Sequence, residues 1–126
     1  MDKIFLAEKL VAIHLRSFPQ GTSAVSSPED ALQVLTMKRK KGEVAKLHRH
    51  IPKKRVTETL QECLIVMRGE VRYDLFDADK RRFREVIVRA GEAMLTLGVA
   101  HEVHFLEDAE AYELKNGPHS EDKVSL

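Results

Sequence analysis

Short runs in which apolar and polar residues alternate constrain this chain more than any other feature of its sequence. Residues 9–16 and 83–89 alternate with a period of two, which is typical of a half-buried β-strand. Glycine turns such as Gly69-Glu70 and Ala90-Gly91-Glu92 separate neighbouring runs, as expected for hairpins. Seven to nine short strands with a turn roughly every 8–12 residues predict an all-β sandwich or barrel.

The other expected strands are less regular. We predict them at residues 31–38, 44–50, 57–68, 71–76, 93–97, 101–105 and 109–115. Residues 1–8 are the one segment for which we expect a short helix or an N-terminal arm.

The composition fits one domain that spans residues 1–126. Hydrophobic residues make up 43% and charged residues 33%, which is ordinary for a soluble globular protein. The formal net charge of +1 and the low aromatic content argue against a nucleic-acid partner. No apolar run approaches the ~20 residues of a membrane span. Because Cys63 is the only cysteine and no secretion signal is evident, we expect a cytoplasmic protein without an intrachain disulfide.

Two histidines one residue apart, His48 and His50, are the strongest sign of a functional site. Side chains at i and i+2 of a strand lie on one face with Cα atoms roughly 6.5–7 Å apart, so one metal ion could accept both imidazoles. Glu62 and His101, brought in from other strands, would complete a four-ligand cage. Such a cage suits one divalent transition metal (Fe, Mn, Ni, Cu or Zn) rather than calcium or magnesium. His104 has the opposite strand parity and is predicted to lie on the surface.

These residues and their spacing resemble the two sequence signatures of the cupin superfamily. The segment similar to the first signature begins at Gly42 and reaches His48-Arg49-His50 after five intervening residues. It ends with Glu62 and, after six more intervening residues, Gly69. The segment similar to the second signature consists of Gly91, Gly98 and His101, with six residues between the two glycines and two residues between Gly98 and His101. Together the two motifs span about half of the chain.

The chain departs from the family pattern within the first signature. Three or four residues usually separate the second histidine from the glutamate, whereas here the gap is the eleven residues 51–61. This insert is predicted to form an extra loop or a lengthened hairpin near the metal, and it makes Glu58 a rival of Glu62 as ligand. We prefer Glu62, because six residues separate it from Gly69, which is the spacing of the family.

The resemblance implies a double-stranded β-helix, that is, a jelly-roll barrel of two antiparallel sheets. The metal ligands would come from interior positions, and the mouth of the barrel would be the substrate pocket. Many small cupins dimerise through an edge strand or an exchanged N-terminal strand, so a homodimer is also implied.

A metal-dependent enzyme is the leading functional hypothesis. Three imidazoles and one carboxylate would leave coordination positions open for Lewis-acid isomerisation or epimerisation of a sugar or keto acid, or for dioxygenase chemistry. Glu58 and Tyr73 are candidate catalytic acids or bases. Lys53, Lys54 and Arg55 form either a solvated loop or a basic lid that binds an anionic substrate. The alternatives are a non-catalytic metal-cupin that binds or senses a small ligand, and a domain whose metal is structural.

Overall fold

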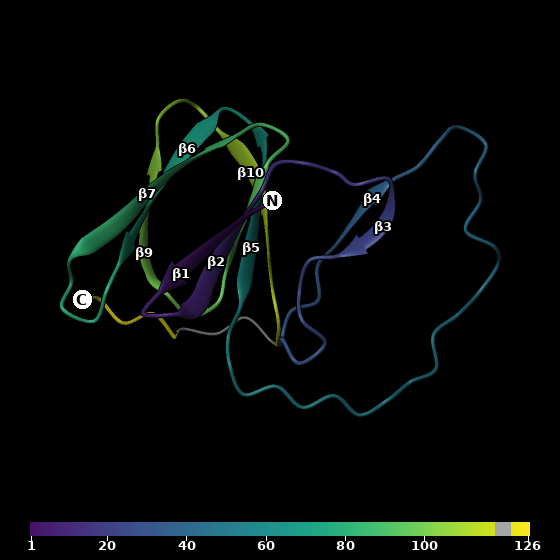
Figure 1. Cartoon of the computed structure of the whole chain (residues 1–126), viewed down its shortest axis with the longest axis horizontal. Coiled ribbons are helices and arrows are strands. Elements are labelled where there is room, and N and C mark those ends of the chain that lie inside the picture. Colours follow the sequence, from purple (N-terminus) through teal and green to yellow (C-terminus); the bar gives the residue numbers. More distant parts are fainter. Residues whose placement is uncertain (118–121) are drawn as a thin grey trace.

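The computed structural model describes residues 1–117 and 122–126, and every regular element in these ranges is a β-strand. The strands are β1 (Asp2–Leu6), β2 (Lys9–Leu15), β3 (Gly21–Ala24), β4 (Leu35–Lys38), β5 (Glu62–Arg68), β6 (Glu70–Phe76), β7 (Arg82–Arg89), β8 (Ala93–Thr96), β9 (Ala100–Phe105) and β10 (Glu110–Lys115). They form antiparallel sheets with the orders β1-β2-β8-β5-β10, β7-β6-β9 and β3-β4. Figure 1 shows the five- and three-stranded sheets packed together on the left and the β3-β4 hairpin standing apart on the right. In the part of the chain that the structure describes, no helix could cross a membrane.

Two apolar clusters stabilise the five-stranded sheet, one on each face. The inner cluster, between the five- and three-stranded sheets, includes Ile4, Val66 and Leu75. The outer cluster is built on Ile13, Cys63 and Leu95 and is covered by partly buried side chains of the segment between β3 and β4. Because both faces are covered, the four residues of β8 are all buried, which explains why this strand reads as a continuous apolar run.

The N-terminal segment is a strand, so the predicted helix at residues 1–8 is wrong. β1 pairs antiparallel with β2, and Ile4 is only 1% exposed. Ala7 and Glu8 make the turn with φ values of 49° and 67°, a region that residues other than glycine rarely adopt. Hairpin turns of this kind usually contain asparagine or glycine, so the sequence carries no turn signal here. Pairing with β2 therefore overrides local propensity.

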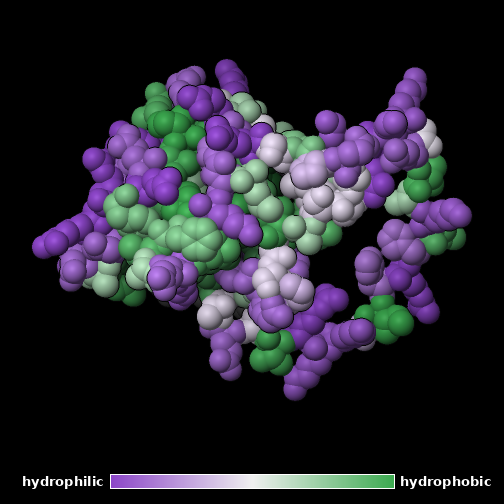
Figure 2. All heavy atoms as spheres, viewed as in Figure 1, coloured by the Kyte–Doolittle hydropathy of each residue, from purple (hydrophilic) through white to green (hydrophobic). Residues whose placement is uncertain are grey.

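The predicted strand at residues 44–50 is also wrong, because residues 39–61 (hereafter the arm) contain no strand. The arm projects away from the sheets in Figure 1, and Figure 2 shows apolar side chains spaced along it between hydrophilic ones. Val44, Leu47 and Ile51 are 78%, 103% and 74% exposed. A period-two pattern marks the faces of a strand but does not supply the partner strand that would bury one of them.

The packed sheets do not close into the predicted barrel. The five-stranded sheet ends in β1 and β10, the three-stranded sheet ends in β7 and β9, and within residues 1–117 no ladder joins these edges. The structure is therefore an antiparallel all-β fold of two packed sheets with a separate hairpin.

The hairpin glycine between β5 and β6 provides a test of this packing. Gly69 has φ +83°, and a Cβ there would overlap the carbonyl oxygen of Asp108, whereas Gly91 has a similar φ of +86° with nothing within 4 Å. We expect Gly69→Ala to lower the free energy of unfolding by about 3 kcal/mol and Gly91→Ala by about 1 kcal/mol, since only the first adds a backbone overlap to the φ strain. Urea unfolding of both variants measures the difference. Equal losses would show that the approach of Asp108 to Gly69 does not constrain the fold.

Candidate functional site

Four polar side chains from four strands meet at the open end of the two packed sheets, where the arm joins β5; Tyr73 is buried, Glu62 is half-buried, and Glu113 and His101 are exposed. Glu62 is the first residue of β5, Glu113 lies on β10, Tyr73 on β6 and His101 on β9. Glu62 lies opposite Lys115 of β10, which places Glu113 diagonally beside it on the same face. Charge interactions link Glu62 with Glu113 and His101, and the rings of Tyr73 and His101 have centroids 5.7 Å apart. We call this group the Glu62–His101 cluster.

The two carboxyl groups of the cluster are crowded. Burial raises the pKa of Glu62 above its ordinary value, and the hydrogen bond and negative charge of Glu113 raise it further. The positive charges that His101 and Lys115 can carry act in the opposite direction and are smaller influences. The site therefore favours either a shared proton or a cation between these carboxyl groups.

Tyr73 is a hydrogen-bond donor at neutral pH. Burial is the largest cause that raises the pKa of its phenol, and the charges of Glu113 and Glu62 add to it. The phenol therefore stays protonated, which excludes the role of a base and suits it to donate a hydrogen bond rather than to give up its proton.

The imidazole of His101 is oriented with one nitrogen free. Its Nδ1 lies 2.8 Å from the carbonyl oxygen of Val99. A carbonyl oxygen can only accept a hydrogen bond, so the Nδ1 atom of His101 carries the hydrogen. In the neutral ring the Nε2 atom therefore presents its lone pair. His48 has the same arrangement, with Nδ1 2.6 Å from the carbonyl oxygen of Lys46. Histidines that bind metals commonly donate their second nitrogen in this way.

The structure does not gather all four predicted ligands. It brings Glu62 and His101 together, but His48 and His50 lie on the exposed arm, away from the sheets (Figure 1). The rings of His48 and His50 are neighbours of one another, with centroids 5.3 Å apart and planes at 77°. The arm thus presents a histidine pair, and the sheets present a separate carboxylate and imidazole.

The other predicted site residues also lie on the arm. Lys53, Lys54, Arg55 and Glu58 are exposed, and the structure gives them no ion-pair partner within residues 1–117 and 122–126. The end of the arm is tethered to the sheet by Asn116. Its side chain accepts the backbone N–H of Gln61 at 2.8 Å and donates to the carbonyl oxygen of Thr59 at 2.9 Å.

Glu113 is the member of the cluster that sequence reasoning missed. It lies in the predicted strand at 109–115, but nothing in that strand distinguishes it from a surface glutamate. That Glu113 lies beside Glu62 becomes evident only once β10 is known to pair with β5 in this register. The sequence offered only a weak sign of this role, because Glu113 is an acidic residue in a strand in which every second side chain would face inward.

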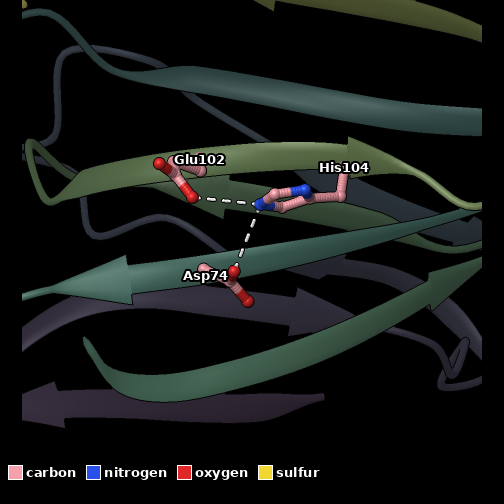
Figure 3. A group of neighbouring side chains, drawn as sticks. All are labelled: Asp74, Glu102 and His104. Carbon is pink, nitrogen blue, oxygen red and sulfur yellow. Dashed lines mark hydrogen bonds and ion pairs between the residues drawn. The ribbon is translucent and has the colours of Figure 1, made fainter.

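A second group, Asp74, Glu102 and His104, lies on the outer face of the three-stranded sheet (Figure 3). One donor atom from each residue lies within 4.8 Å of the others, so the group could hold a metal ion. His104 Nε2 is 3.2 Å from Asp74 and 3.0 Å from Glu102. As predicted, His104 faces away from the Glu62–His101 cluster.

Two arginines already neutralise this outer group. Arg72 Nε lies 3.1 Å from Asp74, and Arg82 lies 3.7 Å from it, while the side chain of Asp74 is only 4% exposed. Both arginines also pair with Glu85. A metal ion would have to compete with both guanidinium groups, so the arrangement is better explained as an ion-pair network that lets Asp74 be buried.

Comparisons with protein-family models, curated proteins and solved structures find no match for this chain. The similarity to cupins therefore rests on the motif residues themselves.

The ion-pair network on the outer face can be tested by stability. Asp74→Asn removes the buried charge that faces Arg72 and Arg82, so we expect the free energy of unfolding to fall by about 3 kcal/mol. The control Glu85→Gln removes a carboxylate that is 46% exposed in the same network, and we expect a loss below about 1 kcal/mol. Urea unfolding measures both, and an Asp74→Asn variant as stable as the control would contradict the role given to Asp74.

Proposed function

We propose that this chain is a metal-dependent enzyme of the cupin type, with a divalent transition metal bound by Glu62 and His101 between the sheets. His48 and His50 complete the ligand set when the arm packs against the sheets and closes the jelly-roll barrel. The observation that carries the proposal is the meeting of Glu62 and His101, from different sheets, with Glu113 beside them.

The donor chemistry of the cluster suits such a metal. A divalent cation would relieve the repulsion between two crowded carboxylates that no arginine reaches within the described residues. His101 and His48 each hold Nε2 free through a carbonyl bond at Nδ1. Carboxylate oxygen together with imidazole nitrogen is a donor set accepted by manganese, iron, nickel, copper and zinc.

The arm has the length and the composition to reach the cluster. His48 stands fourteen positions before Glu62, which allows an extended span of about 45 Å. The sheets offer unpaired edges at β9 and β10. Pairing with an edge would give the arm backbone a hydrogen-bonding ladder and would bury exposed apolar side chains such as Val44 and Ile51.

The residues around the cluster suit acid–base work on a small anionic, sugar-like or keto-acid substrate. The bound ion would supply Lewis acidity, or redox chemistry if it is iron. The Tyr73 phenol, which keeps its proton, donates a hydrogen bond to substrate, and the Glu113 carboxyl group lies beside Glu62 as a hydrogen-bond partner. Lys53, Lys54 and Arg55 place positive charge on the arm, where it attracts an anion. Isomerase, epimerase and dioxygenase reactions are all consistent with this arrangement.

Metal content of paired variants tests the proposed ligand set. We expect the wild-type chain, loaded with Mn²⁺ or Zn²⁺ and desalted, to retain about one equivalent of metal. Glu62→Gln/His101→Ala and His48→Ala/His50→Ala should each retain almost none, because each pair removes two ligands. The matched control is Glu102→Gln/His104→Gln on the outer face, which should bind like the wild type. Elemental analysis gives the stoichiometry, and circular dichroism confirms that each variant keeps its β structure.

The variants separate the competing outcomes. Loss of metal only in the control pair would place the ion in the outer group and contradict the proposal. Loss in Glu62→Gln/His101→Ala but not in His48→Ala/His50→Ala would show that the arm supplies no ligand.

A further inference from the structure

Positive charge is concentrated in the arm. Residues 39–61 contain eight basic and two acidic residues, a formal net charge of +6, whereas the whole chain carries only +1 and the remainder is therefore net acidic. The basic residues are Arg39, Lys40, Lys41, Lys46, Arg49, Lys53, Lys54 and Arg55. The near-zero net charge of the chain thus conceals a strongly basic segment.

The basic side chains of the arm are exposed, and most of them are unpaired. Arg39 lies 3.5 Å from Glu43, and within residues 1–117 and 122–126 the other seven form no ion pair. The arm projects away from the sheets (Figure 1). Charges farther away than a Debye length, about 10 Å at 0.1 M salt, are largely screened. A charged surface that approaches the arm therefore meets the positive charge of the arm rather than the net charge of the chain.

Exposed aliphatic side chains stand among these basic groups (Figure 2). Val44, Leu47, Ile51 and Val56 are 72–103% exposed. Residues 39–61 contain no phenylalanine, tyrosine or tryptophan on which a base could stack, and no helix or strand that could enter a groove. A nucleic acid would therefore satisfy only the basic residues. A surface with anionic groups above an apolar interior would satisfy the basic and the aliphatic side chains together.

We propose that the arm binds an anionic lipid surface, with its lysines and arginines at the head groups and with Leu47 and Ile51 at the acyl boundary. Each basic residue near such a surface adds to the attraction, and burial of aliphatic side chains adds a second contribution. Binding here needs no metal, so the inference goes beyond the proposed function. Seating of the arm against the sheets would withdraw Val44 and Ile51 from lipid, so the closed arm and the lipid-bound arm are alternative positions.

Co-sedimentation of the full chain with lipid vesicles, in EDTA and about 0.1 M salt, tests the proposal. We expect binding to vesicles of phosphatidylcholine with an equal amount of phosphatidylglycerol, and binding at least about tenfold weaker to phosphatidylcholine alone. Lys53→Glu/Lys54→Glu/Arg55→Glu should weaken binding to the anionic vesicles about a hundredfold, and Leu47→Ser/Ile51→Ser about tenfold.

The matched control is Lys3→Glu/Arg81→Glu/Arg84→Glu, which makes the same change of charge at three exposed residues outside the arm that form no ion pair within the described part of the chain. It should bind the anionic vesicles like the wild type. Because residues 39–61 contain no strand, the arm variants should keep the β structure, which circular dichroism checks.

Three results would overturn the proposal. Equal binding to both kinds of vesicle would show that the charge of the head group is not recognised. An equal loss of binding in the control would show that the charge of the whole chain, rather than the arm, attracts lipid. Binding of a DNA duplex that Leu47→Ser/Ile51→Ser retains, without binding of vesicles, would reassign the arm to nucleic acid. Since EDTA removes metal, none of these results depends on whether the ligands proposed for the ion are correct.

Discussion

The ladders that hold β5 between β8 and β10 determine the positions of both carboxyl groups in the candidate site. Through them Glu62 lies opposite Thr96 on one side and Lys115 on the other. The same register directs Glu62 to the inner face and Cys63 to the outer apolar cluster, where burial raises the pKa of the thiol to about 11. A slip of one residue would exchange the two side chains, placing a carboxylate among apolar residues and an unreactive thiol in the site.

The buried Asp74 on the outer face and the half-buried Glu62 with its exposed neighbour Glu113 differ in what neutralises them. Asp74, on the outer face, lies between Arg72 and Arg82, so its charge is balanced within the fold. Glu62 and Glu113 are crowded together between the sheets, where histidine and lysine compensate only in part. Uncompensated acidic groups cost stability, and such costs are commonly tolerated where a ligand or a proton is to be held. This contrast is the reason for proposing a metal site at the Glu62–His101 cluster, although the outer group brings three donors closer together.

The end of the sheets near the β8–β9 turn combines the features on which function depends. Residues 97–99 form this turn, line a hollow together with residues of the β1–β2 and β6–β7 turns, and lead through Ala100 into His101. The arm joins β5 at Glu62, and Asn116 tethers it just before that point. Rigid strands thus position the polar groups, while a long connection carries the histidine pair and the basic residues, a division of roles common in proteins that bind small molecules.

Alternation and turn residues, read from the sequence, determined that the chain is all-β, and they placed β2, β6, β7, β9 and β10 to within a residue or two. These features are local, since side-chain parity and turn geometry depend on neighbours along the chain. Motif spacing selected Glu62 and His101 together with His48 and His50, and the structure brings only the first two into one cluster. Only the tertiary structure decided that Asp2–Leu6 form a strand, that residues 44–50 pair with no edge, and that Glu113 joins the cluster. Each of these depends on which strand lies beside which, and contacts between distant segments are set by packing of the whole sheet rather than by local pattern.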